Sequence, residues 1–308
     1  MACFKPLEGY RTPSGGWTSK RKDSTGQFFN VPCGQCIGCR LDYSISWAIR
    51  CLHEASLHDA NSFITLTYNP LEMPRDGSLN KKHFQDFIKR LRKSLEPNTI
   101  RYYHCGEYGP KYERPHYHAL IFGHDFPDKT FWKPGPKGHK LYRSETLEQL
   151  WPQGFSLIGE VTSESAAYCA RYSMKKIRGK ALQIIDPDTA LKPYERLDEN
   201  TGEILQLQPE YSTMSTNPGI GRNWYETFKD DVFPDDFVIY KGRRTKTPQY
   251  YRRLLEKESP ELAERLRKIR QLALAKHHEN NTRQRLDTRE KVKLAQTQTL
   301  GRDYETGT

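Results

Sequence analysis

The sequence of 308 residues lacks the marks of several protein classes. No stretch approaches the ~18 uninterrupted apolar residues of a membrane span, and the opening MACFKPLEGY has no apolar signal-peptide core. There is no internal repeat and no Gly-x-x-x-x-Gly-Lys-Ser/Thr motif for phosphate binding. We therefore expect a protein of the cytoplasm with no membrane partner and no nucleotide cofactor site, which argues against a fused helicase or NTPase.

Apolar residues are also scarce, at 35% of the chain, and the mean hydropathy is −0.86. The length still allows one large domain or two modest ones with a real core. Positive charge is abundant, because the net charge is +11 and the isoelectric point is near 9.2. This balance is typical of proteins that bind polyanions such as nucleic acids.

Cysteine is present in an odd number, seven, which in a reducing compartment predicts thiols or metal ligands rather than a disulfide framework. Four of them, near the N-terminus, could close a tetrahedral zinc site: Cys3, Cys33, Cys36 and Cys39. His53 could replace Cys3 as the fourth ligand, and loop thiols or a redox pair are the alternatives. The other three are expected to be small buried side chains: Cys51, Cys105 and Cys169.

The periodicity of apolar residues predicts the main elements of the first 180 residues. Helical spacing runs over 41–55, from Asn80 as a cap to about 95, and from Ser163 as a cap to about 177. Strands are expected at 62–68, 100–105, 116–122 and 155–161, with a turn at 106–110 between the second and third. Residues 1–30 are predicted to be an irregular arm, and 124–143 a polar loop.

The last third of the chain is more polar. Residues 181–245 alternate short apolar patches with Pro and Asp and allow no firm assignment. From Pro248 to about Leu300 the chain is predicted to be helical. Residues 241–308 hold 18 Lys and Arg against nine Asp and Glu, a net charge of +9. Such a tail usually contacts nucleic acid or lies solvated.

The segment Arg114–Phe122 places two histidines two residues apart in an apolar run. On a strand, His116 and His118 point to the same face and form one edge of a metal site. Glu107, expected in the preceding turn, could fold back as the third ligand, and Glu113 ranks second. Imidazole and carboxylate ligands suit Mg²⁺ or Mn²⁺.

About fifty residues later, Tyr168 and Tyr172 lie four residues apart and share a helix face. Lys175 follows on a similar face and could stabilise a phenolate or a phosphate. A metal edge followed by a tyrosine pair predicts cleavage of a nucleic-acid strand through a phosphotyrosine link. Basic residues predicted to contact DNA phosphates are Lys89, Arg90, Arg92, Lys93, Arg171 and Lys176.

These motifs resemble those of HUH endonucleases. His116-Tyr-His118 is similar to their histidine motif, Phe63-Ile-Thr-Leu-Thr67 to their first structural strand, and Tyr168-x-x-x-Tyr172-x-x-Lys175 to the two-tyrosine motif of rolling-circle initiators. Four further segments resemble the replication initiators of gokushovirus-type microviruses, which are single-stranded DNA phages. They are Pro32–Arg40, Phe63–Tyr68, Cys105–Gly109 and Asn217–Gly221.

The resemblance implies an α+β fold in which helices pack on an antiparallel sheet, like the palm or RNA-recognition-motif fold. The resemblance covers residues 1 to about 225. Together with the composition, it divides the chain into a cysteine-containing segment (1–45), an endonuclease core (46–180), an accessory region (181–245) and a basic helical tail (246–308). One tyrosine would nick the origin and stay linked to the 5′ phosphate, and the other would later help to close the circle. Single-stranded and origin DNA, a host helicase and a host polymerase would be the partners, in the cytoplasm of the bacterial host.

Three alternatives remain open at this point. A plasmid-type initiator or a transposase of the same superfamily would share the cleavage chemistry. A non-catalytic zinc-containing DNA-binding protein would use the cysteines and basic helices alone, with structural histidines. A metal-dependent hydrolase would use water as the nucleophile.

Overall fold

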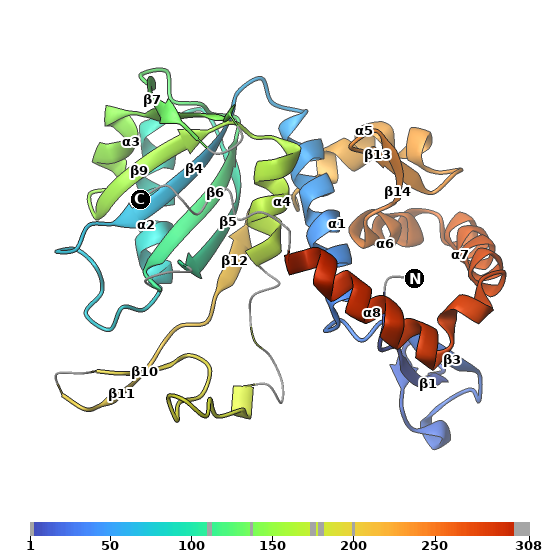
Figure 1. Ribbon diagram of the computed structural model, residues 1–308. Coiled ribbons are helices and arrows are strands. Elements are labelled where there is room, and N and C mark those ends of the chain that lie inside the picture. Colours follow the sequence, from blue (N-terminus) through green and yellow to red (C-terminus); the bar gives the residue numbers. More distant parts are fainter. Residues whose placement is uncertain are drawn as a thin grey trace. The chain divides into compact units, whose positions relative to one another are not determined.

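The computed structural model describes residues 3–109, 113–135, 138–172, 177, 182–198 and 201–298. The chain divides into two compact units (Figure 1). One is built from Met1–Ile45 with Arg252–Gly301, and the other mainly from Ser46–Tyr251. The four-part division expected from the sequence stays a prediction, although its first and last segments both contribute to the first unit.

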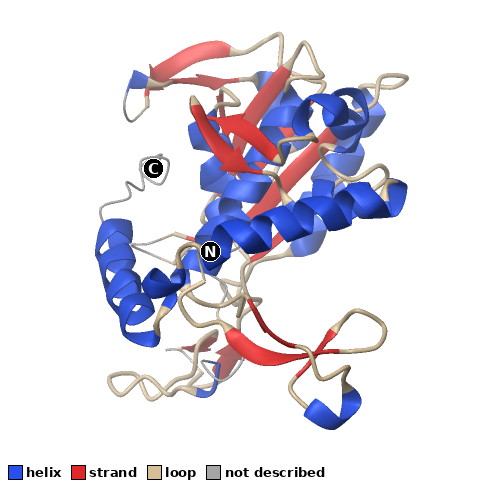
Figure 2. Cartoon of the chain, turned by 90° about the vertical axis from the view of Figure 1, so that its right-hand side faces the viewer, coloured by secondary structure: helices blue, strands red, loops and turns tan. Residues whose placement is uncertain are grey.

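The larger unit is organised by a seven-stranded sheet whose paired neighbours are all antiparallel. In spatial order its strands are β12 (Tyr211–Met214), β5 (Arg101–Tyr108), β6 (Pro115–Phe122), β4 (Asn61–Tyr68), β9 (Gly154–Gly159), β8 (Lys140–Arg143) and β7 (Thr130–Pro134). Figure 2 shows the mixture of helices and strands. The predicted α+β class with a large antiparallel sheet is confirmed.

One face of this sheet is covered by α2 (Lys81–Ser94) and α3 (Glu145–Leu150). The side chain of Asn80 accepts a hydrogen bond from the backbone N–H of Lys82, so the predicted cap is confirmed. Buried residues of α2 pack against alternate residues of β4 and β6; those of the helix are Phe84, Phe87, Ile88 and Leu91. Burying each such side chain contributes about 1.5–3 kcal/mol.

The opposite face is covered by α4 (Ser163–Tyr172) and the second half of α1 (Ile37–Ala55). Cys51 and Cys169, from these helices, are fully buried against Phe63 and Leu120, as expected for small apolar side chains. The predicted cap of α4 was one residue late. The Thr162 hydroxyl, rather than that of Ser163, accepts the backbone N–H groups of Glu164 and Ser165.

Three local predictions were wrong. Residues 1–30 are not an irregular arm, because β1 (Leu7–Arg11), β2 (Trp17–Thr18) and β3 (Phe28–Val31) form a three-stranded sheet. The expected polar loop at 124–143 contains β7 and β8, which pair with each other beside β9. The expected turn at 106–110 begins later, because Gly106–Tyr108 continue β5 between β6 and β12.

Residues 181–245, unassigned from the sequence, supply β12 to the sheet edge and several short elements. These are β10 (Glu195–Leu197), β11 (Ile204–Gln206), α5 (Arg222–Val232), β13 (Phe237–Tyr240) and β14 (Arg243–Lys246). Gly221 precedes α5 at φ 77°, and its N–H donates to Glu54 Oε2 at 2.6 Å. A side chain there would collide with the Tyr251 hydroxyl, so the position requires glycine.

The C-terminal segment is helical as predicted. Its helices are α6 (Gln249–Glu258), α7 (Pro260–Ala275) and α8 (Arg283–Gln298). Short 3₁₀ turns occur at Arg21–Asp23 and His278–Asn281. None of the helices in the described part of the chain combines the length and apolar character needed to cross a lipid bilayer.

Candidate active site

Three potential metal ligands meet on the neighbouring strands β5 and β6. Glu107 lies directly opposite His116 in the strand register, and Cys105 lies opposite His118, so His118 is diagonal to Glu107. Nε2 of His116 lies 2.9 Å from Glu107 Oε1, and Nε2 of His118 lies 3.0 Å from the same oxygen. The three ligand atoms all lie within 4.8 Å of one another. This arrangement can hold one metal ion.

The far side of each imidazole also has a hydrogen-bond partner. His116 Nδ1 lies 3.1 Å from the carbonyl oxygen of Arg114, to which it can donate. His118 Nδ1 lies 2.9 Å from the Thr65 hydroxyl on β4. A histidine that binds a metal through Nε2 carries its proton on Nδ1, and these two partners can hold that tautomer when an ion is bound.

The carboxylate of Glu107 is ionised despite complete burial. Burial raises the pKa of this carboxyl, but hydrogen bonds and charge from His116 and His118 outweigh burial and lower the pKa to about 2. A buried anion flanked by two imidazoles is a strong electrostatic site for a divalent cation.

Tyr168 is brought to this group by α4, which packs on β5 and β6. Its side chain is 2% exposed, and its hydroxyl lies 3.5 Å from His118 Nε2. The Tyr168 ring meets the His118 ring edge to face, with centroids 5.0 Å apart. Tyr172 ends α4 one helical turn later, and its side chain lies outside the described residues, as do Lys175 and Lys176. A phenol therefore stands at the edge of the candidate metal site.

The other residues singled out from the sequence lie elsewhere. Glu113, the second-ranked ligand, pairs with Arg196 at 3.0 Å. The guanidinium of Arg171 lies 5.9 Å from the Tyr168 ring centroid. The basic residues of α2 are on the sheet face opposite the three ligands: Lys89, Arg90, Arg92 and Lys93. Of these, Arg90 donates to the Leu150 carbonyl oxygen, which ties it to the fold.

Sequence reasoning treated β4 as a structural strand and missed its contribution to the site. Thr65 contacts His118 Nδ1, and the Phe63 ring stacks on the His118 ring with centroids 5.6 Å apart. The alternation Phe63-x-Thr65-x-Thr67 does place these residues on one face. Only the pairing of β4 with β6 shows that this face is the face of the histidines.

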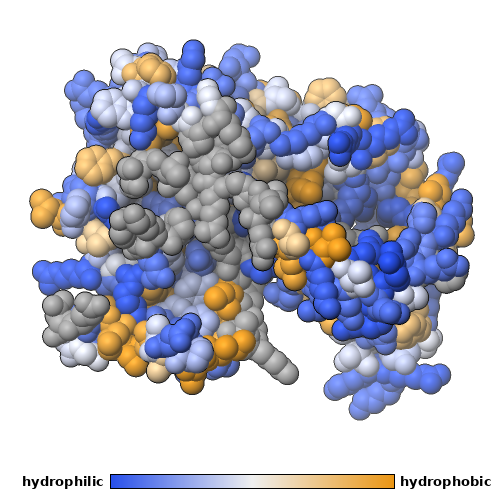
Figure 3. Space-filling view, in the orientation of Figure 1, coloured by the Kyte–Doolittle hydropathy of each residue, from blue (hydrophilic) through white to orange (hydrophobic). Residues whose placement is uncertain are grey.

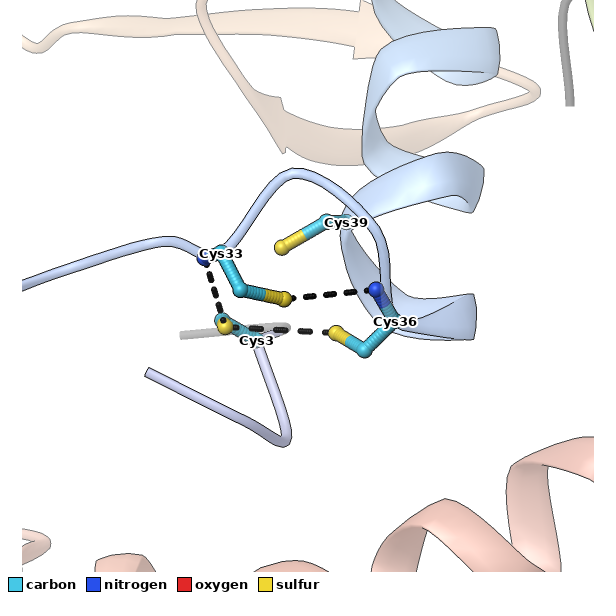
Figure 4. Close-up of side chains that lie close together, drawn as sticks. All are labelled: Cys3, Cys33, Cys36 and Cys39. Atoms are coloured by element: carbon cyan, nitrogen blue, oxygen red, sulfur yellow. Dashed lines mark hydrogen bonds between the residues drawn. The ribbon is translucent and has the colours of Figure 1, made fainter. Parts of the chain in front are cut away.

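The four N-terminal cysteines form a second candidate metal centre, in the smaller unit (Figure 4). Their four sulfur atoms lie within 4.8 Å of one another. Backbone N–H groups point at these sulfurs, among them Phe4 to Cys36 at 3.2 Å, Cys33 to Cys3 at 3.3 Å and Cys36 to Cys33 at 3.3 Å. The structure thus brings Cys3 rather than His53 to the other three.

The environment of these thiols is uneven. Burial raises the pKa of Cys3 and Cys39. For Cys36, burial is outweighed by hydrogen bonds that include the Phe4 N–H, and its pKa falls to about 7. Helix α8 covers the cluster, because Leu286 packs on it and Arg289 lies over the Phe4 ring. The four sulfurs can therefore hold a metal in a closed shell.

Comparisons with known proteins identify the family of this chain. Residues 61–177, which contain the three ligands and Tyr168, match the family model of the replication-associated protein ORF2. The chain belongs to the phage replication-associated proteins, and within them to the microvirus type. No solved structure gives a significant match.

Three relatives carry this assignment. Replication-associated protein ORF2 of Spiroplasma virus 4 is 33% identical, over 84% of this chain and 81% of the relative. Replication-associated protein VP4 of Bdellovibrio phage phiMH2K is 31% identical, over 85% and 79%. Replication-associated protein ORF4 of Chlamydia phage 1 is 28% identical, over 74% and 54%.

Proposed function

We propose that this protein starts rolling-circle replication of a phage genome by nicking one DNA strand through a phosphotyrosine link. The observation that carries the proposal is the position of the Tyr168 hydroxyl, 3.5 Å from Nε2 of His118, beside the buried group of Glu107, His116 and His118. A phenol, two imidazoles and a carboxylate on one sheet face are the parts that strand transfer requires.

The three ligands fit Mg²⁺ or Mn²⁺. Their mixed imidazole and carboxylate donors suit either ion, and three protein ligands leave positions for a phosphate oxygen. When bound, the ion would neutralise the scissile phosphate and orient it. Glu107 and the two histidines would hold it, with Thr65 and the Arg114 carbonyl fixing the imidazole rings.

In the proposed step, the Tyr168 oxygen attacks the scissile phosphorus and loses its proton. A bond forms between this oxygen and phosphorus, and the bond from phosphorus to the 3′ oxygen breaks. The 3′ oxygen gains a proton and leaves as a primer hydroxyl, while the 5′ phosphate stays on the tyrosine. The energy of the phosphodiester is conserved, so the link can later be resolved by another 3′ hydroxyl.

Tyr172 is proposed as the second nucleophile, which cleaves the regenerated origin after one round of synthesis. Lys175 would stabilise charge on the phenolate or the phosphate, and Arg171 and Lys176 would contact flanking phosphates. The basic residues of α2 are proposed to bind origin DNA away from the cut. Unwinding and synthesis would come from a host helicase and polymerase in the host cytoplasm.

The test is covalent capture on the viral strand of the phage genome, which contains the origin. With Mn²⁺, the wild-type protein should give an adduct that survives denaturation, and mass spectrometry should place it on Tyr168 or Tyr172. The double variant Tyr168→Phe/Tyr172→Phe should give none, whereas Tyr142→Phe, on the other sheet face, should behave as wild type. An adduct with the double variant would refute the tyrosine assignment. Cleavage without any adduct would indicate a hydrolase that uses water.

We also propose that Cys3, Cys33, Cys36 and Cys39 bind one structural Zn²⁺. Four thiols in a closed cluster, backbone N–H groups aimed at sulfur and an apolar cover from Leu286 support this role. Metal analysis of the purified protein should find one zinc per chain. Zinc binding without any strand cleavage would instead favour a non-catalytic DNA-binding protein.

A further inference from the structure

Two of the candidate metal ligands belong to a row of directly paired residues that runs across the sheet and ends at an exposed aromatic side chain. Glu107 is opposite His116, His116 is opposite Thr67, and Thr67 is opposite Phe155 on β9. Residues directly opposite one another in a ladder project to the same face. Phe155 therefore projects to the same face as His116. The backbones of the two residues are separated by two strand spacings, or about 10 Å. Its side chain is 57% exposed.

The sequence before Phe155 explains this close approach. A side chain at Gly154 would meet the Thr67 carbonyl oxygen and the Asn69 nitrogen at 2.2 and 2.4 Å. Glycine lets the start of β9 lie tight against the end of β4. Phe155 is thus fixed by the backbone beside Thr67, and more than half of its surface is exposed.

A second exposed aromatic side chain, Trp132, lies in β7, the outermost strand of the sheet. Tyr142 of β8 is opposite Ile158 and packs with the α2 core, so Arg143, the next residue, projects to the face of Phe155. The Arg143 guanidinium lies 4.9 Å from the Trp132 ring centroid and also pairs with Glu148 of α3, the helix on the opposite face, so these groups meet at the sheet edge. Trp132 is 53% exposed and sits at a β-bulge in β7. The bulge sets Lys133 opposite Leu141, which adds a cation to this face.

Figure 3 shows that the surface of the larger unit is mainly hydrophilic, with separate apolar groups. Exposed aromatic rings beside cations and continuous with a phosphate site are the features of a surface that binds single-stranded nucleic acid. An unstacked base can lie on an aromatic ring, whereas the bases of a duplex are already stacked and covered.

We propose that Phe155 and Trp132 form a stacking platform for the bases of single-stranded DNA next to the scissile phosphate. The proposal rests on the proposed nicking function, because that function puts a phosphate at His116. Arg143 and Lys133 contact the backbone of the strand as it crosses β9, β8 and β7. Stacking tolerates any base, so the platform holds the strand while other contacts select the origin.

The test measures binding of fluorescein-labelled single-stranded oligo(dT) by anisotropy, in EDTA and at fixed ionic strength. Phe155→Ala and Trp132→Ala should each weaken binding by about five- to a hundredfold, the range expected for loss of one stacked base. Phe155→Trp should restore it. Binding of a duplex should change less than twofold in all variants.

Phe131→Ala is the matched control. Phe131 is 58% exposed on the same strand, but it pairs with Tyr142 and its ring contacts the Tyr142 ring, so it belongs to the opposite face. Equal binding by wild type, Phe155→Ala and Trp132→Ala, or an equal loss in Phe131→Ala, would overturn the platform. Because EDTA prevents the metal-dependent step, this result is independent of whether Tyr168 forms an adduct.

Discussion

The two groups of potential metal ligands in this chain differ in their construction. The four cysteines offer four sulfur ligands under an apolar cover, and they join a segment before β1 to a turn and helix some thirty residues later. The group on the sheet offers only two imidazoles and one carboxylate, all from adjacent strands, with a phenol at its edge. Structural zinc sites are closed, and catalytic sites keep a position open.

This difference predicts the effect of removing each metal. The four cysteines lie outside the strands of the smaller unit, in loops and in the first turn of α1, so their metal should contribute mainly to folding. The sheet site is held by the β-ladder whether or not an ion is bound, so its metal should contribute mainly to chemistry. The predictions below test this separation, from the largest expected effect to the smallest.

The largest effect should follow Cys33→Ser/Cys36→Ser. We expect loss of the bound zinc and of the thermal transition of the smaller unit, since structural zinc binding is worth about 10 kcal/mol or more. Nicking should persist within a few-fold, because the three sheet ligands belong to the other unit. Metal analysis measures the bound zinc, calorimetry measures the thermal transition, and adduct formation measures nicking. Cys51→Ala, at a buried thiol outside the cluster, should keep its zinc, and a double serine variant that also keeps its zinc would contradict the proposed site.

His118→Ala should have the converse effect. Nicking should fall about a thousandfold, equivalent to about 4 kcal/mol of transition-state stabilisation, while zinc content and thermal unfolding stay near wild type. His83→Ala, on α2 and the other sheet face, is the control and should nick normally. EDTA should abolish nicking but leave most DNA binding, because Lys and Arg supply the salt-dependent contacts. A His118→Ala protein that nicks normally would exclude the sheet site from catalysis.

The sequence was informative about the sheet site because its ligands are close in the chain. The His-x-His spacing and the strand period placed both imidazoles on one face, as the structure does. Glu107 was proposed as a ligand but assigned to a turn, because Gly106 and Gly109 suggest a chain reversal. Pairing with β6 on one side and β12 on the other keeps Gly106 in the strand, where the Tyr211 ring fills the space of a side chain.

Three features depend on contacts between residues far apart in the chain, so the sequence pattern did not predict them. The choice between Cys3 and His53 depends on where the segment before β1 brings Cys3 and where α1 carries His53, and the spacing of the cysteines does not predict either position. Strands β7 and β8 have exposed or half-buried side chains and lie in a segment rich in Pro, Gly and Lys, so the segment resembles a loop, whereas ladder pairing beside β9 holds it in the sheet. The basic residues of α2 were predicted to bind DNA, and the apolar side of the helix places them on the sheet face opposite the three ligands.

His53 offers a third test, because it was the alternative zinc ligand. Its ring stacks on Trp224, and its Nδ1 lies 3.0 Å from the Tyr251 hydroxyl. Burial lowers the pKa of His53 to about 3, below the ordinary 6.5, so the unfolded chain binds more protons between these values. Stability should therefore be full above pH 6.5 and fall by about 2 kcal/mol between pH 7 and pH 5. The free energy of unfolding of His53→Phe, measured in urea, should lose this pH dependence, and the zinc content should be unchanged. A loss of zinc would instead indicate that His53 is a ligand of the cysteine site.

The smallest expected effect concerns Thr65, which contacts His118 on the side of the ring away from Glu107. Thr65→Val keeps the shape of the side chain but removes the hydroxyl that contacts His118 Nδ1. Without that partner the imidazole is less firmly held in its metal-binding tautomer, and the apparent affinity for Mn²⁺ should fall about tenfold. The rate at saturating Mn²⁺ should change little, since no ligand is lost. Thr67→Val is the matched control, because its hydroxyl lies 3.3 Å from the Phe155 carbonyl oxygen rather than beside a histidine. Nicking measured across a Mn²⁺ titration separates the two variants, and equal midpoints would show that Thr65 only supports the strand.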